Sequence, residues 1–362
     1  MKEKNIVISG GHTGGHIFPL IAIYSALKQN NSSTMYFYGS KNGPEQQIAI
    51  DHKINFKNIN PSQIRTRNPF KLFLGIINFY KSYIKAKKFL IDDNPEIVII
   101  TGGFTSAPVG WSAKKLKIPF IIYCPDIKPG WAIKSLIKHA KKIYCSVDES
   151  TQFFPKDKTI VTGYPLRKEF YSDSILKYNN QRQAIPVKTL LIMGGSLGSY
   201  EINEFTKQNL IFLLSQYKII HICGKNDYQK LNRRKNQLNN ETKRNYELYD
   251  FSNDISLLMA KSDLVFCRAG ASILGELPAT SLPAILYPGQ FSDQIFNAQY
   301  LEKKGAAIIV KNINKHALDV INKLLTDTKK LEKMKEAMKL INPDNASNKI
   351  ATLILEYINV QK

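Results

Sequence analysis

The feature that most constrains this fold is a short apolar run that ends in glycines and precedes a helical pattern. It occurs first where Ile6–Ile8 leads into Gly10–Gly15, before an apolar-periodic run from Leu20. It occurs again where Lys188–Met193 leads into Gly194–Gly198. A strand, a glycine-rich turn and a helix in this order form the repeating unit of a parallel, doubly wound sheet. The sequence therefore predicts an α/β fold with one such sheet in each half.

Further apolar runs extend the pattern in both halves. Strands are expected at residues 34–38, 97–100, 118–123, 143–146 and 159–162, and then at 218–223, 245–249, 264–267 and 282–287. Helices are expected at residues 20–29, 132–142, 202–215, 314–327, 329–340 and 346–358. A chain of 362 residues has room for about two domains. Sites in such sheets lie at the carboxyl ends of the strands, where the glycines stand here.

The chain is strongly basic, with 51 Lys and Arg against 29 Asp and Glu and a formal net charge of +22. This excess favours an anionic partner such as a nucleic acid, an anionic lipid or a phosphorylated substrate. The sequence has no helix-turn-helix, RNP motif or zinc-finger spacing, so we expect no nucleic-acid partner.

Cysteine usage and hydropathy indicate a reducing compartment and no membrane span. The four cysteines are far apart and form no C-x-x-C pair, which is typical of a cytosolic protein without disulfides. The first apolar run is too short for a signal peptide, and no run approaches the roughly 18 apolar residues of a membrane-spanning helix. No cluster of His, Asp and Glu has metal-ligand spacing, so we expect neither a metal nor another cofactor.

The first glycine-rich turn suits an anionic group. Glycines let the backbone approach a bulky ligand, and a helix N-terminus presents free N–H groups and a partial positive charge. The spacing matches neither the dinucleotide fingerprint nor the P-loop. A histidine side chain titrates near neutral pH, so His16 suits a general base, and it equally suits an orienting or hydrogen-bonding role. The alternative for the whole turn is a plain tight connection between strand and helix.

The second half carries a richer set of polar groups. The turn at Gly194–Gly198 suits a phosphate, unless it is only a close-packed turn. After a strand that ends at Arg268, a helix beginning near Ala271 can take a diphosphate, and Glu276 can accept two ribose hydroxyls. Gln294 and Asn297 are three positions apart and so lie on one helix face, and Asp293 adjoins them; such polar groups can read sugar hydroxyls. The alternative for Glu276 alone is a charged surface helix.

Four motifs in this order make the sequence specific. They are Gly10-Gly11-x-Thr13-Gly14-Gly15-His16, Gly102-Gly103-Phe104-x-Ser106-x-Pro108, Gly194-Gly195-Ser196-x-Gly198, and Arg268-x-Gly270-Ala271 followed by Glu276 and Asp293-Gln294-x-x-Asn297-Ala298. Together they resemble the MurG family, the N-acetylglucosaminyltransferases that act on lipid I in peptidoglycan synthesis. The resemblance covers nearly the whole chain.

The resemblance implies a GT-B fold, with two Rossmann-like domains and their parallel sheets on either side of an inter-domain cleft. The first domain, residues 1–163 joined by the C-terminal helix at 343–362, would bind the acceptor and the membrane. The second domain, residues 164–342, would bind UDP-N-acetylglucosamine as a substrate. The implied reaction is an inverting transfer of N-acetylglucosamine to the 4-hydroxyl of the polyprenyl-diphosphate-linked N-acetylmuramyl-pentapeptide, lipid I, which gives lipid II.

The resemblance also implies individual site residues. Those expected at the donor phosphates and uracil are Gly195, Ser196, Ser252, Ala271 and Ser272. Those expected at the ribose, at the sugar hydroxyls and from the inter-domain link are Glu276, Asp293, Gln294 and Arg167. Those expected at the acceptor are Thr13, Gly14, Gly15, Gly102, Gly103 and Asp126, with His16 as the catalytic group.

The sequence departs from the family pattern at two places, and the first of them leaves the acceptor open. The segment Tyr123-Cys124-Pro125-Asp126 stands where the family typically has His-Glu-x-Asn or Asp, and His12 stands where it usually has glycine. No role is assigned to His12. The alternatives are a transferase of the same fold with another glycolipid acceptor, and a non-catalytic protein that binds nucleotide sugars or nucleic acids.

One segment of the first half suits an anionic membrane surface. Residues 52–91 contain no Asp or Glu. They mix Lys and Arg with aromatic and aliphatic residues. For Arg65–Ile77 we expect docking on an anionic leaflet, which places the protein peripherally on the cytoplasmic face of the cell membrane. For Phe79–Leu90 we expect an ordinary helix with a core face and solvated lysines.

Overall fold

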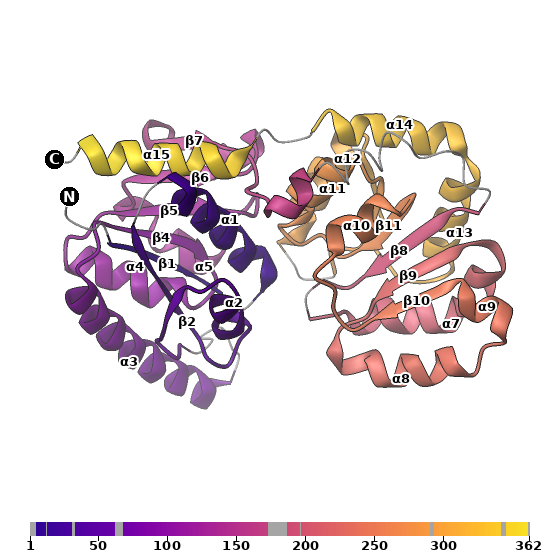
Figure 1. Ribbon diagram of the computed structural model, residues 1–362, viewed down its shortest axis with the longest axis horizontal. Coiled ribbons are helices and arrows are strands. Elements are labelled where there is room, and N and C mark those ends of the chain that lie inside the picture. Colours follow the sequence, from indigo (N-terminus) through magenta and orange to yellow (C-terminus); the bar gives the residue numbers. More distant parts are fainter. Residues whose placement is uncertain are drawn as a thin grey trace. The chain divides into compact units, whose positions relative to one another are not determined.

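The computed structural model describes residues 5–11, 13–30, 33–61, 68–172, 187–195, 197–289, 293–341 and 345–360. Two compact units make up the chain. The first comprises Met1–Arg167 and Asp344–Lys362, and the second comprises Lys168–Pro343 (Figure 1). Each unit is built on its own sheet.

The sheet of the first unit has the strand order β3-β2-β1-β4-β5-β6-β7, and every neighbouring pair is parallel. The strands are β1 (Asn5–Gly10), β2 (Thr34–Gly39), β3 (Asn55–Asn58), β4 (Ile97–Gly102), β5 (Phe120–Cys124), β6 (Lys142–Cys145) and β7 (Thr159–Val161). The strand order reverses between β1 and β4, and there Gly10 pairs with Gly102. This is the topological switch point, where open α/β sheets bind their ligands.

Helices cover both faces of this sheet, and this explains why its strands are almost wholly apolar. The helices are α1 (Gly14–Asn30), α2 (Glu45–Asp51), α3 (Pro69–Asp93), α4 (Ser106–Lys115), α5 (Trp131–Lys134) and α15 (Ala346–Val360). Successive residues of β4 point to opposite faces: Ile97 and Ile99 pack with α1 and α15, whereas Val98 and Ile100 pack with α3 and α4. The C-terminal helix therefore belongs to the core of the first unit (Figure 1).

The sheet of the second unit has the order β10-β9-β8-β11-β12-β13, again with all pairs parallel. Its strands are β8 (Thr189–Met193), β9 (Lys218–Ile222), β10 (Tyr246–Tyr249), β11 (Leu264–Cys267), β12 (Ala284–Leu286) and β13 (Ala307–Ile309). Its helices are α7 (Tyr200–Gln216), α8 (Lys225–Asn236), α9 (Asn240–Arg244), α10 (Ile255–Ala260), α11 (Ile273–Thr280), α12 (Gln294–Lys303), α13 (Lys315–Thr326) and α14 (Thr328–Lys339). The switch point lies between β8 and β11.

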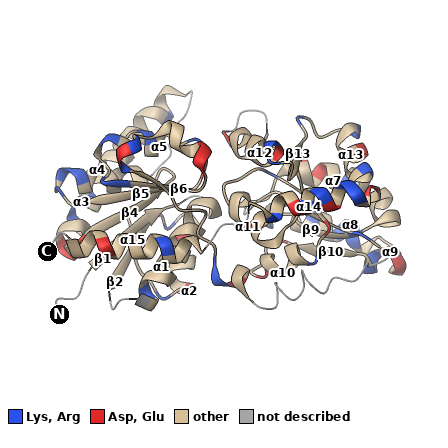
Figure 2. Ribbon diagram, turned by 90° about the horizontal axis from the view of Figure 1, so that it is seen from above, with Lys and Arg blue, Asp and Glu red and all other residues tan. Residues whose placement is uncertain are grey.

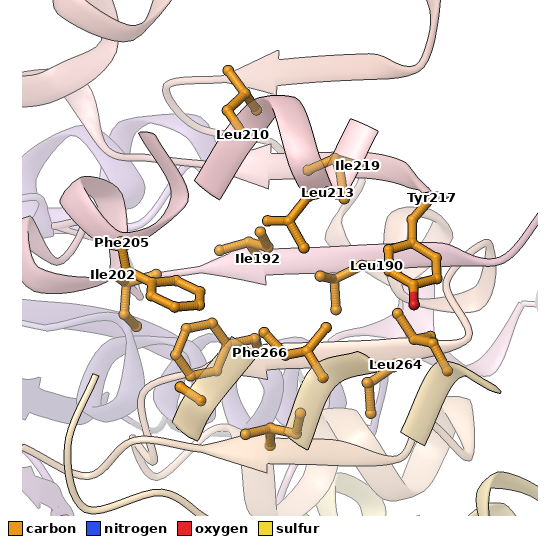
Figure 3. Packing of buried hydrophobic residues seen from close by; sticks show 14 of the residues in the cluster. Leu190, Ile192, Ile202, Phe205, Leu210, Leu213, Tyr217, Ile219, Leu264 and Phe266 are labelled. Carbon is orange, nitrogen blue, oxygen red and sulfur yellow. The ribbon is translucent and has the colours of Figure 1, made fainter. Parts of the chain in front are cut away.

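One part of the core of the second unit forms where α7 packs on β8 and β11. Leu190 and Ile192 of β8 lie between residues of α7 and β11 (Figure 3). The rings of Phe205 and Phe266 meet edge to face, with centroids 5.4 Å apart. This packing fixes the start of α7 over the carboxyl end of the sheet.

One expected helix is wrong. In place of a helix at 132–142, the chain forms the short α5 and a 3-10 turn at Ile137–His139. Ala140 is already extended, because β6 begins two residues later. The apolar residues of the segment still reach the core, since Ala132, Ile133 and Leu136 are buried.

Candidate active site

The ring of His16 is held by the end of β4. Its Nδ1 lies 3.1 Å from the carbonyl oxygen of Thr101, and the Thr101 hydroxyl donates to the carbonyl oxygen of His16 at 2.6 Å. Because a carbonyl can only accept, Nδ1 must carry the proton. In the neutral imidazole, the other nitrogen, Nε2, then has the free lone pair that a general base needs.

The two glycine turns of the first unit lie backbone to backbone. Gly102 and Gly103 have φ angles of +119° and +75°. A Cβ added at Gly102 would lie 3.0 Å from His16 Cε1, and one added at Gly103 would lie 2.5 Å from the carbonyl oxygen of Gly11. Only glycine allows both this conformation and this approach.

A buried serine clamps the same two strand ends together. The Ser106 hydroxyl lies 3.0 Å from the carbonyl oxygen of Ser9 and 2.6 Å from that of Gly102, and it can donate to either. It also accepts a hydrogen bond from the Gly102 N–H at 3.0 Å. Nearby, the Thr105 hydroxyl oxygen is buried and has no hydrogen-bond partner among the described residues. The serine explains why the turn after β4 stays fixed against β1.

The predicted acceptor residues follow three neighbouring strands. Thr13, Gly14 and Gly15 come after β1, Gly102 and Gly103 end or follow β4, and Asp126 follows β5. Because parallel strands end at one edge, these residues share the carboxyl edge of the sheet with His16. His12 lies outside the described residues.

Arg167, predicted at the donor, ends the first unit. Its guanidinium lies over the ring of Phe18 in α1, with Cζ 4.3 Å from the ring centroid. A cation stacked on an aromatic face in this way is held close to the helix that carries His16.

In the second unit, the glycine turn follows β8 and precedes α7. Gly195 and Gly198 have positive φ angles, and a Cβ at Gly195 would meet no atom of the described residues within 4 Å. Gly194 and Gly198 are tightly packed by contrast. Among the described residues, nothing therefore covers the backbone at Gly195. Ser196 lies outside the described residues.

The start of α11 forms the second predicted phosphate site. Ser272 is the N-cap residue, Ala271 is buried before it, and a Cβ at Gly270 would meet nothing within 4 Å in the described part of the chain. Glu276 lies in the first turn and is buried. Burial first, and then the Glu276 carboxylate, raise the pKa of the Cys267 thiol at the end of β11. The carboxylate is thus close to the strand end from which the helix starts.

Arg268 has a role that the sequence did not assign. Its Nη2 donates to the carbonyl oxygen of Pro288 at 3.1 Å, and its Nε lies 3.4 Å from Gln294 Oε1. The Asn297 amide donates to the carbonyl oxygen of Ala269 at 3.1 Å. These contacts tie the start of α12, with Asp293 and Gln294, to the end of β11. The only sequence signal was the position of Arg268 inside a glycine motif.

Ser252 lies farther along the same edge. It follows β10, the edge strand, which β9 and β8 separate from β11. Its hydroxyl accepts from the N–H of Asp254 at 3.1 Å, which fixes the turn. Among the described residues, no three His, Cys, Asp or Glu side chains are placed to hold a metal ion. Nor is any helix in the described ranges long and apolar enough to cross a bilayer.

Family models match both units. The glycosyltransferase family 28 N-terminal domain matches residues 6–145, and the glycosyltransferase family 28 C-terminal domain matches residues 189–354.

Solved structures of similar fold confirm the GT-B fold predicted from the sequence. MurG of Acinetobacter baumannii superposes with a TM-score of 0.74 at 22% identity, over 98% of this chain and 99% of that one. The S. aureus MnaA–UDP co-structure superposes with a TM-score of 0.70 at 17% identity, over 98% of this chain and 97% of that one.

Two full-length relatives carry the same name, UDP-N-acetylglucosamine--N-acetylmuramyl-(pentapeptide) pyrophosphoryl-undecaprenol N-acetylglucosamine transferase. The protein from Lachnoclostridium phytofermentans is 34% identical, over 98% of this chain and 99% of its own length. The protein from Clostridium novyi is 31% identical, over 99% of both. The chain therefore belongs to the MurG family of glycosyltransferases.

Proposed function

We infer that this protein transfers N-acetylglucosamine from UDP-N-acetylglucosamine to lipid I and so makes lipid II for peptidoglycan synthesis. The observation that carries the inference is identity of 34% along the whole length of a relative with that name. The positions of His16, Glu276 and the glycine turns at the carboxyl edges of the two sheets support it.

On the donor side, we assign the diphosphate to the glycine turn at Gly195 and to the start of α11. Backbone N–H groups and the partial positive charge of a helix start can offset the charge of the departing UDP. The Glu276 carboxylate is proposed to accept hydrogen bonds from the ribose hydroxyls. Asp293 and Gln294 are proposed to bind the sugar hydroxyls, with Gln294 oriented by Arg268.

On the acceptor side, we assign the diphosphate of lipid I to the glycine turns after β1 and β4. His16 is proposed to remove the proton from the attacking 4-hydroxyl through Nε2. The hydrogen bond from Nδ1 to Thr101 supports this assignment, because it orients the ring and leaves Nε2 able to accept. As the proton arrives, the Thr101 carbonyl also stabilises the imidazolium that forms.

Association with the membrane is proposed to occur through α3. Phe70 and Phe73 are 69% and 61% exposed, and Ile76, Tyr80 and Ile84 are also exposed. Lysines accompany these residues along the helix (Figure 2). Such a face suits peripheral binding to an anionic, cytoplasmic leaflet, where a lipid-linked acceptor resides. Arg65 and Arg67 lie outside the described residues.

The exposed face extends beyond the segment expected from the sequence. The expected core face of Phe79–Leu90 is present, since Ala86 and Leu90 are buried. Tyr80 and Ile84, however, continue the exposed stripe past Ile77. The proposed docking face therefore spans more than half of α3.

A transfer assay with the purified full-length chain tests the function. Labelled UDP-N-acetylglucosamine is supplied with lipid I, or with polyprenyl-diphosphate glycolipids that carry another sugar. Labelled lipid II is expected only with lipid I. Product only with another acceptor would instead favour a different glycolipid, the alternative that Tyr123–Asp126 raises. Binding of the nucleotide sugar without any transfer would contradict an enzymatic role.

A further inference from the structure

A buried chain of hydrogen bonds lies next to the glycine turn of the second unit. It starts at Tyr246 in β10, whose hydroxyl lies 2.9 Å from His221 Nδ1 in β9. His221 Nε2 lies 3.0 Å from Oδ1 of Asn203 in α7. The Asn203 amide nitrogen then donates to the carbonyl oxygen of Cys223 at 2.8 Å and to Oδ2 of Asp227 in α8 at 2.6 Å.

The partners fix the position of every proton in this chain. The amide nitrogen of Asn203 faces two oxygens, so its Oδ1 faces the imidazole and can only accept. His221 Nε2 therefore carries the proton, and Nδ1 accepts from the Tyr246 hydroxyl. Burial lowers the pKa of His221 to about 3, so the imidazole is neutral at physiological pH. Each polar side-chain atom of His221 and Asn203 has a partner.

The Cys223 end of this hydrogen-bond chain packs directly against the glycine turn. A Cβ added at Gly198 would lie 2.3 Å from the carbonyl oxygen of Cys223, the same oxygen that Asn203 holds. A Cβ added at Gly194 would lie 2.1 Å from the N–H nitrogen of Ser199. The turn after β8 is thus stacked on the turn after β9. A shift of the Cys223 carbonyl would therefore move both of these turns.

The hydrogen-bond chain also holds the first turns of two helices, α7 and α8. The Asn203 N–H donates to the carbonyl oxygen of Ser199 at 2.9 Å, within the first turn of α7. Asp227 lies in the first turn of α8. The Asn203 side chain, which the neutral imidazole holds, therefore connects the beginnings of α7 and α8.

We propose that His221, backed by Tyr246 and acting through Asn203, is a positioning residue for the donor diphosphate site. It holds the Cys223 carbonyl against Gly198 and so fixes the backbone at Gly198, beside the proposed diphosphate site. The proposal rests on the assignment of this turn to UDP-N-acetylglucosamine made above. His221 itself touches no substrate and exchanges no proton in the reaction.

Substitution of His221 in the full-length protein tests the proposal. His221→Ala removes both the donor to Asn203 and the acceptor for Tyr246. We expect KM for UDP-N-acetylglucosamine and Kd for UDP to rise about tenfold, as for lost supporting contacts in other sites, with kcat changed less than about threefold. His221→Gln supplies a donor and an acceptor on one side chain, and should restore both constants to within about threefold of the wild type.

A matched control separates positioning from general loss of stability. Ile321→Ala empties a buried site in α13 of the same core and should lower the thermal midpoint without raising KM. An equal rise of KM in Ile321→Ala, or no rise in His221→Ala, would overturn the proposal. If His221→Ala does not fold, Tyr246→Phe removes only one hydroxyl and should still raise KM, by about threefold.

Two readouts keep this proposal distinct from the proposed function. Nitrogen-15 NMR of the His221 ring should show a neutral imidazole protonated at Nε2 from pH 6 to 8, whatever the enzyme does. A cationic ring, or a proton on Nδ1, would contradict the hydrogen-bond chain itself. The shape of the kcat/KM profile against pH should be unchanged in His221→Gln. A wild-type protein that neither binds UDP nor transfers sugar would contradict the function instead.

Discussion

His16 is the residue whose substitution most directly tests the proposed chemistry. In His16→Asn, the side-chain amide can still donate to the Thr101 carbonyl, but no nitrogen remains that can take up a proton. We expect kcat for transfer to lipid I to fall by about 10²–10⁴, the usual contribution of a general base. Kd for UDP should not change, because the nucleotide is assigned to the second unit. Initial rates and calorimetric titration with UDP measure the two effects.

His139→Asn provides the control for His16. This histidine also lies in the first unit but packs against Trp111, away from the glycine turns. It should leave both constants unchanged. Full transfer activity in His16→Asn would exclude the role as base and leave only an orienting role for the ring.

Burial of His221 should also make the folding stability of the protein depend on pH. Its pKa is about 3 when folded, against about 6.5 in an unfolded chain. Between these values the unfolded chain binds a proton that the folded one does not, so the free energy of unfolding falls as the pH drops through this range. From pH 7 to pH 5 this group alone should remove about 2 kcal/mol.

Hydrogen exchange in β8 and β9, followed in urea at pH 7 and pH 5, measures this loss. In His221→Gln the difference between the two pH values should be smaller by that amount, since glutamine does not titrate. An identical difference in both proteins would mean that His221 is not held neutral.

The sequence indicated which residues to propose for the site, but not how those residues are held. Glycines at Gly102 and Gly198 were visible as motif members, yet their close contacts depend on segments far apart in the chain. The same is true of Arg268, whose partner Gln294 lies 26 positions away. A tautomer such as that of His16 is set by a backbone carbonyl, so no residue pattern can reveal it.

Helix α3 is the element whose exposed face most clearly calls for an experiment. Phe70→Ser together with Phe73→Ser removes two exposed rings without disturbing the core. Each buried aromatic contributes about 1.5–3 kcal/mol to transfer from water, so binding to vesicles containing phosphatidylglycerol should fall more than about tenfold. Co-sedimentation with such vesicles, compared with neutral phosphatidylcholine vesicles, provides the measurement.

Ile50→Ser is the matched control for α3. This residue of α2 is 57% exposed and lies on another element. It should not change vesicle binding. Binding that is lost equally in the control, or retained in the double variant, would show that α3 is not the docking face.

The strands at the centre of each sheet were predicted from the sequence, whereas two edge strands were missed. The expected runs at the centre of each sheet became β1, β4, β8 and β11, whose residues are buried on both faces. The strands β3 and β13 were missed; both lie at a sheet edge, and β3 is largely polar. The helix expected at 132–142 does not form, because the backbone is extended from Ala140, where it leads into β6.

At the scale of the whole molecule, the chain crosses from the first unit to the second and returns. The return places α15 against α1, where Ile350, Ile354 and Ile358 enter the first core. The first unit therefore needs residues from both ends of the sequence, while the second unit needs only the middle. Stability of the two units should respond separately to substitutions in α15.

Ile354→Asp tests this division. The side chain is fully buried, so a carboxylate there should destabilise the first unit by about 3–5 kcal/mol, the cost of an uncompensated buried charge. Both tryptophans, Trp111 and Trp131, lie in the first unit, so their fluorescence should report a lowered unfolding midpoint. UDP binding, assigned to the second unit, should persist after this transition.

Val360→Asp is the control within the same helix, because Val360 is 86% exposed and its substitution should leave the fluorescence midpoint unchanged. If Ile354→Asp instead abolishes UDP binding and both units unfold in one transition, the second sheet depends on the first. The donor site would then not be a property of the second unit alone. Persistence of UDP binding would mean that the middle of the chain folds its own nucleotide site, with α15 serving only the acceptor half.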